Sequence, residues 1–332
     1  MLVCLYEDRP QQVPGLKLLV LSLSRHCSTW PILLRFPGIG EDLEKWLSRF
    51  RNVTVCREPL AVFGSYNVKP SVLLDGLSVD TECLWLDTDV LVNGDLASLA
   101  REPLETLIVT QDPWEYACGS THRCGTWGLS AGRDLPGPLN SAVVRVSVRH
   151  QDLLFTWQRL LCRQDYLSEQ VKPVGDRNTH LLGDQDALSA IAASFDFSHV
   201  PVRRLLHSSE ILQHHGAGAY GLSHRYTNLR KGLPPLLHAM GAVKPWRAPN
   251  HPKLLGDFRD YYERTYLELS PYVHLARQYR SLLDEDTSWM DLHTLAAKMS
   301  SVIAMGNPCF KGMAQALVHG ALRNARTTLR RE

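Results

Sequence analysis

Apolar runs of strand length alternate with longer segments through the first two thirds of the chain. The longer segments include residues 14–27, which begin with Pro and have helical length, and residues 40–50, whose apolar side chains share one helical face. Continuous apolar strands separated by helices indicate an α/β fold, with a mostly parallel central sheet and helices on both faces. The strand-like runs are residues 2–6, 31–36, 52–56, 83–92, 106–112 and 139–146.

The pattern changes near residue 250, after which helical segments follow one another without strand-like runs. We therefore expect a catalytic domain at residues 1–250 and a helical C-terminal extension at residues 251–332. Three roles for the extension stay open: capping the sheet, a homodimer contact, and a peripheral membrane contact. A solvated basic end is the simplest alternative to the last. The basic side chains near the end are Arg323, Arg326, Arg330 and Arg331, with Glu332 as their acidic neighbour.

Composition excludes some partners and favours a compartment. A net charge of +2 gives no general surface for nucleic acid. No apolar run reaches the ~18 residues that span a bilayer, and the first residues are too short and too soon acidic for a secretory signal. Most of the 8 cysteines lie in apolar segments and are expected to be free buried thiols. These features predict a cytoplasmic protein, with a peripheral membrane position left open.

Two carboxylates interrupt the apolar run at residues 83–92, which reads CLWLDTDVLV. In a continuous strand Asp87 and Asp89 would share one face of a dry sheet, which is unfavourable without a cation or strong donors. If the strand instead ends there, the pair lies at the carboxyl edge, where open α/β sheets bind ligands. Oxygen ligands suit Mg²⁺ or Mn²⁺, usually shared with phosphates of a substrate. The alternative is a turn with solvated aspartates.

The stretch LLHAMGAVKPWR carries further candidate ligands. His238 can bind a transition metal, Gly241 allows close approach of the backbone, and Lys244 can pair with a phosphate. Together they would complete a metal shell and neutralise a departing diphosphate. Taken singly, each residue is also compatible with an ordinary end of a helix or strand.

Two enzyme classes place Asp-x-Asp after an apolar strand. One is the metal-dependent nucleotide-sugar glycosyltransferases, and the other is the dehalogenase-type phosphatases, in which Asp87 would be the nucleophile. The acidic stretch GDRNTHLLGDQD is compatible with the second class. The phosphatase interpretation does not account for HAMGAVKPW.

With these motifs in place, the chain resembles retaining glycosyltransferase family 8, the glycogenin and lipopolysaccharide galactosyltransferase group, which has the GT-A fold. Five blocks match in order: YNVKPSVLL, LWLDTDVLV, LNSAVVRV, GDQDALSAI and HAMGAVKPW. They cover roughly residues 60–246. The resemblance implies transfer of a hexose from a nucleotide diphosphate sugar, most simply a UDP-hexose, with Mn²⁺ or Mg²⁺ as cofactor. The acceptor stays open among a glycan, a lipid-linked sugar, a protein and a small molecule.

The resemblance also implies roles for individual residues. Asp87, Asp89 and His238 would bind the metal, and Lys244 with the backbone near Gly241 would hold the diphosphate. The residues expected to contact the donor are Lys69, Asn140, Ser141, Thr88, Asp184 and Gln185. Asp186 has two alternatives, contact with the donor or support of the turn that opens a helix.

Two departures from the family pattern affect the expected donor site. Ala142 stands where the family has Gly, which is expected to tighten the sugar pocket. The N-terminal nucleotide loop is replaced by LYEDRPQQVPG, so Tyr6, Glu7 and Asp8 are the candidates for contact with the base. Because Gln185 is an amide and a poor nucleophile, we expect attack on the same face of the sugar, with the departing phosphate accepting the proton. Asp184 would hydrogen-bond to sugar hydroxyls.

Two alternatives concern binding rather than chemistry. Residues 113–138 form a long segment with Trp114, Tyr116, His122 and Trp127, whose rings would either contact the acceptor or pack the segment onto its own domain. The whole chain could also be a protein that holds a nucleotide sugar without turning it over. The complete set of expected metal ligands favours an enzyme.

Overall fold

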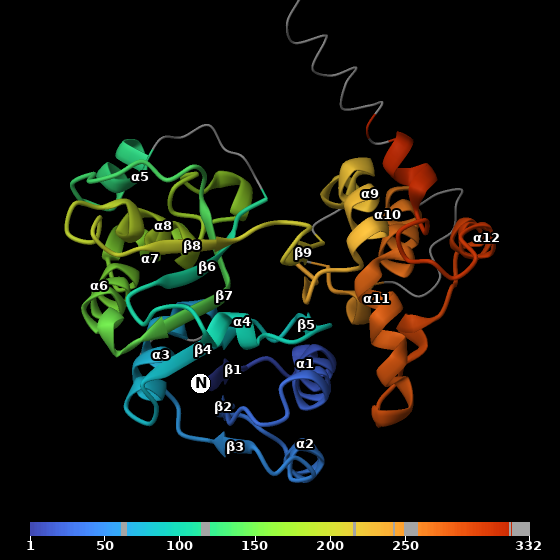
Figure 1. Cartoon of the computed structure of the whole chain (residues 1–332), viewed down its shortest axis with the longest axis horizontal. Helices are drawn as coiled ribbons and strands as arrows, with labels where there is room; N and C mark the ends of the chain where they lie inside the picture. The colour runs from blue at the N-terminus through green and yellow to red at the C-terminus, as the bar shows by residue number, and fades with distance from the viewer. Residues whose placement is uncertain are drawn as a thin grey trace, which may run out of the picture. The chain divides into compact units, whose positions relative to one another are not determined.

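The computed structural model describes residues 1–60, 65–113, 120–214, 217–241, 243–248, 258–318 and 320. The chain divides into two compact units (Figure 1). The first contains residues 1–10, 27–88 and 96–206, and the second contains residues 11–26, 89–95 and 207–332. The expected functional division at residue 250 stays a prediction.

A seven-stranded sheet forms the first unit, in the order β3-β2-β1-β4-β7-β6-β8. Its neighbours pair in parallel, except that β7 runs antiparallel to both β4 and β6. The mostly parallel sheet expected from the apolar runs is therefore confirmed. The strands are β1 (Leu2–Tyr6), β2 (Ile32–Arg35), β3 (Val53–Cys56), β4 (Glu82–Leu86), β6 (Leu107–Gln111), β7 (Leu139–Ser147) and β8 (Val202–Leu205).

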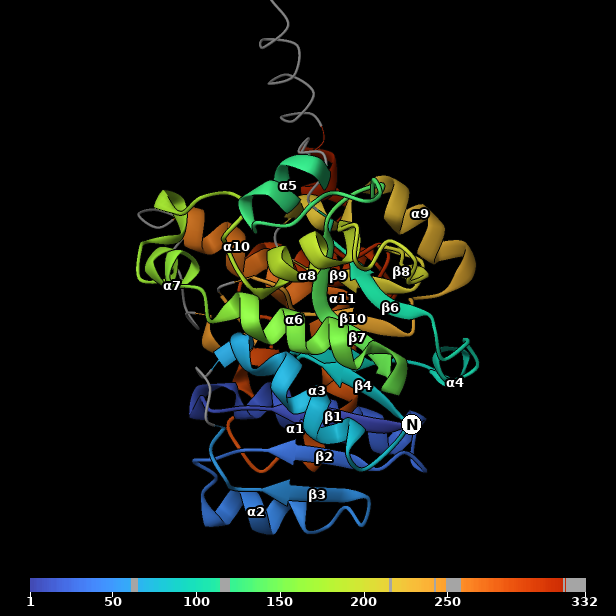
Figure 2. The same ribbon diagram turned by 90° about the vertical axis from the view of Figure 1, so that its left-hand side faces the viewer.

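Helices α3, α6 and α8 cover one face of this sheet, as Figure 2 shows, and their apolar side chains share a core with β1, β4, β6 and β7. Helix α2 lies on the other side of the strands. The long segment after β6 is not entirely a loop, because it contains α5, which packs on α8. The helices of this unit are α2 (Glu41–Leu47), α3 (Lys69–Leu77), α4 (Ala97–Ala100), α5 (Ser120–Thr126), α6 (Gln151–Leu161), α7 (Gln164–Gln170) and α8 (Asp184–Ala193).

The antiparallel strand β7 decides which residues meet at the carboxyl edge of the sheet. Because β7 runs against its neighbours, its first residues lie beside the last residues of β4 and β6. Leu86 of β4 pairs with Val143, and Gln111 of β6 pairs with Leu139. The register between β6 and β7 shifts after Val109, which leaves residues 141–143 of β7 without paired partners on β6.

The second unit contains a three-stranded sheet in the order β5-β10-β9 and a set of helices. Helix α1 packs on β5, where Ser22 Oγ accepts a hydrogen bond from the Val92 backbone N–H at 3.1 Å. The strands are β5 (Val90–Val92), β9 (Ile211–Gln213) and β10 (Leu236–His238). The helices are α1 (Val13–His26), α9 (Leu222–Lys231), α10 (Phe258–Leu269), α11 (Pro271–Ala276) and α12 (Leu295–Ile303).

The described residues bear on two expectations, the lack of a membrane-spanning helix and the presence of free buried cysteines. None of their helices combines the length and hydropathy that crossing a bilayer requires. The described cysteines are free thiols, of which Cys162 is exposed and Cys56 half-buried, whereas the remaining five are buried. The exposed Cys162 follows the last turn of α6 and faces solvent, although its apolar neighbours in sequence predicted burial.

Candidate active site

The two carboxylates at residues 87 and 89 lie between strands, not within one. Strand β4 ends at Leu86, β5 begins at Val90, and these strands belong to different sheets. The Asp87 backbone N–H donates to the Ala142 carbonyl at 2.8 Å, which fixes Asp87 beside the start of β7. The expected strand end at the carboxyl edge is therefore confirmed.

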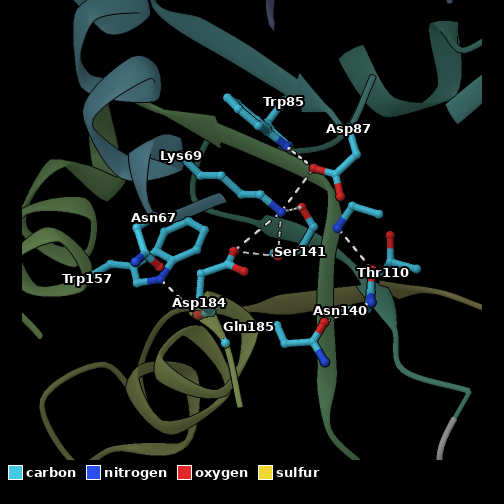
Figure 3. Close-up of polar contacts among 12 residues, drawn as sticks. Asn67, Lys69, Trp85, Asp87, Thr110, Asn140, Ser141, Trp157, Asp184 and Gln185 are labelled. Carbon is cyan, nitrogen blue, oxygen red and sulfur yellow. Dashed lines mark hydrogen bonds and ion pairs between the residues drawn. The ribbon is translucent and has the colours of Figure 1, made fainter. Parts of the chain in front are cut away.

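Lys69 is the centre of a buried polar cluster at this edge (Figure 3). Its ammonium lies 2.9 Å from an oxygen of Asp87 and 3.3 Å from an oxygen of Asp184. It also donates to the Ser141 hydroxyl at 2.8 Å. The Ser141 hydroxyl donates to Asp184 at 2.6 Å, and the Trp85 indole N–H donates to Asp87 at 2.7 Å. The cluster brings together four residues that the sequence had nominated: Lys69, Asp87, Ser141 and Asp184.

Charge balance in this cluster keeps Lys69 protonated. Burial alone would lower the pKa of Lys69, but the carboxylates of Asp184 and Asp87 raise it above its usual value. Burial raises the pKa of Asp184, and the Lys69 ammonium opposes that rise. One ammonium thus faces two carboxyl groups, whose oxygens are hydrogen-bond acceptors that suit sugar hydroxyls or a cation.

A chain of amide hydrogen bonds orients Gln185 next to this cluster. Its Oε1 accepts from Asn140 Nδ2 at 2.9 Å, and its Nε2 donates to Asp112 at 3.0 Å. Because a carboxylate only accepts hydrogen bonds, Asp112 fixes which end of the Gln185 amide faces which way. Asp112 was not among the expected site residues. It directly follows an apolar strand, as Asp87 does, and that signal could have identified it.

The register shift in β7 explains how two consecutive residues reach the same helix. Neighbouring residues of a regular strand point to opposite faces, yet Asn140 contacts Gln185 and Ser141 contacts Asp184, both in the first turn of α8. The Asn140 side chain also accepts from the Ala142 backbone N–H at 2.9 Å, which replaces a missing partner on β6. Ala142 is 1% exposed, so its methyl group is packed within the irregular segment.

A second cluster forms where β5 pairs with β10. His238 pairs with Val90, and the Ala239 N–H donates to the Asp89 carbonyl at 3.0 Å, so the two strands place His238 next to Asp89. His238 Nε2 lies 3.3 Å from one oxygen of Asp89. The Lys244 ammonium pairs with the other oxygen and donates to the Ala239 carbonyl at 2.8 Å. All three polar side chains of this cluster were expected site residues.

The electrostatics of the second cluster favour an ionised Asp89. Burial alone would raise the pKa of Asp89, but the Lys244 ammonium and the His238 imidazole hold it well below its usual range. Tyr272 of α11 is fully buried close by, and burial together with the Asp89 charge raises its pKa. Tyr272 lies in no motif that would have marked it as a site residue. Gly241 has φ 115°, a backbone conformation that favours glycine, so its role includes the turn between His238 and Lys244.

The donor atoms at residues 87, 89 and 238 fit a divalent cation. One ligand atom from each of Asp87, Asp89 and His238 lies within 4.8 Å of the others. Two carboxylates suit Mg²⁺ or Mn²⁺, and the imidazole adds a preference for the transition metal. The buried Nδ1 of His238 has no hydrogen-bond partner among the described residues, so one ring nitrogen is not committed to the protein.

The expected base-binding residues lie at the end of β1. Tyr6 donates its hydroxyl to Asp8 at 3.2 Å, and burial together with Asp8 raises the pKa of Tyr6 to about 12. The Thr88 hydroxyl donates to the fully buried Glu7. Arg9 donates to both oxygens of the same carboxylate, at 2.7 and 3.2 Å. Polar groups therefore gather at this strand end, with Glu7 holding Thr88 in place.

Known proteins resemble the chain in structure and not detectably in sequence. No protein-family model and no curated protein matches the chain significantly. Solved structures match. The galactosyltransferase LgtC, solved in complex with donor and acceptor sugar analogs, is 15% identical with a TM-score of 0.50, over 85% of this chain and 100% of LgtC. The chain has a GT-A glycosyltransferase fold. The likeness noted in the sequence is thus confirmed for the fold.

Two other glycosyltransferases resemble the chain at lower TM-scores. GlyE of Streptococcus pneumoniae TIGR4 is 16% identical with a TM-score of 0.47, over 84% of this chain and 63% of GlyE. The bifunctional WbbM is 13% identical with a TM-score of 0.47, over 83% of this chain and 51% of WbbM. The chain therefore spans about 63% of the length of GlyE and about half of WbbM.

Two aromatic residues of the segment after β6, Trp127 and His122, differ in how far they are buried. Trp127 is 1% exposed, and its indole N–H donates to the His180 carbonyl at 2.9 Å, so this ring packs the segment onto its own unit. His122 is exposed and stacks edge-on against His180. Trp114 and Tyr116 lie outside the described residues, as do the C-terminal arginines.

Asp186 supports the turn that opens α8. Its carboxylate accepts from the backbone N–H groups of Leu182 at 2.9 Å and Gly183 at 3.2 Å, and Arg123 lies 3.9 Å away. Burial raises the pKa of Asp186 to about 6, against the opposing attraction of Arg123. The side chain is 6% exposed, so contact with a donor would require competition with these backbone partners.

Asp186→Asn is expected to change how stability depends on pH. The native pKa of about 6 lies above the ordinary 3.8, so protonated Asp186 stabilises the fold at low pH, and this contribution is lost as pH rises through about 6. Asparagine cannot ionise. The free energy of unfolding of the variant, relative to the wild type, should therefore rise by ~3 kcal/mol between about pH 4 and pH 7. Urea denaturation across this range measures it. A difference that stays flat with pH would mean that Arg123 keeps the carboxylate ionised throughout.

Proposed function

We propose that this chain is a metal-dependent, retaining glycosyltransferase that moves a hexose from a nucleotide diphosphate sugar to an acceptor hydroxyl. The observation that carries the proposal is the pairing of β5 with β10, which sets the His238 imidazole and the Lys244 ammonium against the Asp89 carboxylate. Carboxylate, imidazole and ammonium side chains in one buried group are the chemistry that a metal-bound diphosphate requires. The GT-A fold is compatible with this chemistry.

The metal site proposed here consists of Asp87, Asp89 and His238, with Mn²⁺ or Mg²⁺ as the ion. A bound cation would neutralise the charge that develops on the diphosphate as the glycosidic bond breaks. Lys244 contributes a second positive charge for the same leaving group. Its ammonium is held by Asp89 and the Ala239 carbonyl, so a phosphate would compete with these partners for it.

The sugar would contact the Lys69 cluster. Asp184 and Ser141 offer hydrogen-bond partners to hydroxyl groups, and the Lys69 ammonium opposes the rise in the pKa of Asp184 that burial causes. The amide of Gln185 supports positive charge at the anomeric carbon through its carbonyl dipole, because an amide is too weak a nucleophile to attack. Asp112 and Asn140 hold that amide in one orientation. The acceptor hydroxyl then attacks from the side of the departing phosphate, which accepts its proton.

The nucleotide part of the donor would bind beside the end of β1. Tyr6 and Thr88 would contact the nucleoside, most simply the uridine of UDP. Gly241 would lie near the diphosphate. Asp186 is assigned to the turn before α8 and not to the donor. We further propose a cytoplasmic enzyme whose residues 1–250 form the catalytic domain.

Two alternatives make different predictions. A dehalogenase-type phosphatase would use Asp87 as a nucleophile, but its Oδ1 is bound to both Trp85 and Lys69, and the likeness to LgtC is a likeness of fold to a sugar-transferring enzyme. A silent nucleotide-sugar-binding protein would keep the same site without turnover. Slow release of nucleotide diphosphate from a donor without acceptor separates enzyme from binding protein.

A thermal-shift panel of nucleotide sugars, with and without Mn²⁺, tests the proposal directly. A true donor at ~100 times its Kd should stabilise the protein by ~2.7 kcal/mol, which raises its melting temperature by several degrees. The shift is expected with a UDP-hexose and Mn²⁺ together, and to be much smaller after Mn²⁺ is chelated. Equal shifts with phosphate monoesters, or no shift with any nucleotide sugar, would contradict the proposal.

A further inference from the structure

Lys311 is a buried lysine that the proposed reaction does not use. The residue is 6% exposed, and its ammonium donates to the Nδ1 atom of the His274 imidazole at 3.3 Å. Among the residues that the structure describes, this nitrogen is the one acceptor of the Lys311 ammonium. An ammonium has three N–H donors, and burying a charge without an opposite charge beside it is costly. Lys311 therefore has unused capacity for an acceptor that carries negative charge.

Two further donor groups belong to helix α11 and to the residue that follows it. Because His274 Nδ1 accepts from Lys311, the proton of the neutral imidazole is on Nε2, which is then a donor. Burial, together with the charges of Lys311 and Arg277, lowers the pKa of His274 to about 4, so the ring is neutral at pH 7. Burial and the charge of Arg277 also lower the pKa of Lys311. These three side chains therefore act on one another, and they offer hydrogen-bond donors.

The carboxylates in this region are committed to other partners. Glu268 and Asp291 raise the pKa of Arg277. However, Glu268 forms an ion pair with an arginine of its own helix at 2.7 Å, and Asp291 forms one with another arginine at 2.6 Å. Neither carboxylate affects the pKa of Lys311 or His274, on which burial and neighbouring cations act. Within the described residues, Lys311 and its two basic neighbours thus carry a surplus of positive charge.

The surrounding contacts hold these donors in place. The buried Arg225 guanidinium donates to the Cys309 carbonyl at 3.0 Å and also to the Lys311 carbonyl, which fixes the backbone that carries the lysine. Arg277 donates to two backbone carbonyls, at 2.6 Å and 3.1 Å. These bonds use two of the five N–H donors of its guanidinium. Donors that are fixed before a ligand arrives bind it with a smaller loss of conformational entropy.

We propose that Lys311, His274 and Arg277 bind a small phosphate-type oxyanion, either free phosphate or the phosphate group of a soluble monoester. A phosphate has several strong acceptor oxygens and up to two negative charges, which matches a set of donors with surplus positive charge. The deep position of Lys311 favours a small ligand that can reach it over an extended charged surface. The inference goes beyond the proposed function and uses none of the residues assigned to it.

Equilibrium dialysis of the full chain against radiolabelled inorganic phosphate, with divalent metal ions chelated, tests this site. We expect the wild type to bind one equivalent. Lys311→Met and His274→Ala should each weaken binding by roughly 10- to 100-fold, because hydrogen bonds to a charged group contribute that much to affinity. Circular dichroism should show that both variants are folded, and in buffer without phosphate Lys311→Met should unfold like the wild type.

Two control variants locate the bound phosphate. Lys298→Met removes an exposed lysine of α12 and should bind phosphate like the wild type. Lys244→Met should do so as well, because Lys244 belongs to the proposed diphosphate site. The inference is overturned if the wild type takes up no phosphate, or if Lys311→Met binds it as tightly as Lys298→Met does. Loss of phosphate binding in Lys244→Met would also overturn it, because the anion would then occupy the active site.

A lipid arm separates a soluble ligand from a headgroup. The probes are phosphatidylcholine vesicles with and without phosphatidic acid. If the chain binds the phosphatidic acid vesicles through Lys311 and does not bind free phosphate, the ligand is a lipid headgroup and the inference is wrong. Each of these failures leaves the transferase proposal intact, since the panel of nucleotide sugars tests that proposal separately.

Discussion

Asp89→Asn is expected to lower Mn²⁺-dependent donor turnover by roughly a thousandfold or more. The substitution keeps the shape of the side chain and removes the charge that faces both His238 and Lys244. Because the pKa of Asp89 is depressed, its ionised form stabilises the fold above the ordinary aspartate pKa, and this contribution is lost progressively as pH falls below that value. Some loss of stability at neutral pH should therefore accompany the loss of activity.

Mn²⁺ binding, followed by its paramagnetic resonance signal, separates the two effects. Under conditions where the variant is still folded, it should bind the ion far more weakly than the wild type, and His238→Ala should behave in the same way. Asp95→Asn is the control, since Asp95 is an exposed carboxylate on the same segment of chain. If Asp89→Asn and Asp95→Asn bind Mn²⁺ equally well, the proposed metal site is wrong.

Lys69→Met is expected to cost ~3–5 kcal/mol of folding free energy at neutral pH. The ammonium is 3% exposed and is the shared partner of Asp87, Asp184 and Ser141. Without it, the buried Asp184 must either stay charged without a cation or take up a proton. The loss should therefore shrink as pH falls, and the midpoint of urea denaturation at several pH values measures it.

Two further variants make this prediction specific. Lys69→Met combined with Asp184→Asn should recover part of the loss, because the uncompensated charge is removed. Lys311→Met is the matched control: Lys311 is 6% exposed, faces the His274 imidazole at 3.3 Å and has a pKa that burial lowers. In the described part of the chain it forms no ion pair with a carboxylate, so its replacement should be nearly neutral. Equal losses in Lys69→Met and Lys311→Met would contradict the argument.

Local sequence pattern predicted most strands of the sheet and the carboxyl edge of β4, but it did not predict the edge strand β8. The apolar runs predicted β1, β2, β3 and β6, and the paired carboxylates identified the end of β4. The pattern could not show that residues 83–92 supply strands to two different sheets, because β4 and β5 are both buried and equally apolar. Nor could it show that β7 is antiparallel, since a strand buried on both faces reads the same in either direction.

Local sequence pattern also identified only part of the candidate site. His238 and Lys244 were found because they lie in one short motif, and Lys69 because its segment matched a known block. Tyr272, whose pKa the Asp89 charge helps to raise, comes from a helix far along the sequence, in a segment with no recognisable motif. Asp112 was overlooked although it follows an apolar strand, because a single carboxylate carries less weight than a pair. Its role depends on the partner Gln185, which only the three-dimensional arrangement reveals.

Because β7 pairs irregularly with β6, the number of residues in the segment 139–143 decides whether Asn140 and Ser141 both meet α8. Asn140 and Ser141 can both meet α8 only because the strand departs from its alternating pattern between them and Val144. An in-frame deletion of one residue here would shorten the irregular segment without making the strand regular, and would turn at least one of the two side chains away from its partner. Enzyme variants with new sugar preferences should thus arise by substitution in this segment, and not by insertion or deletion.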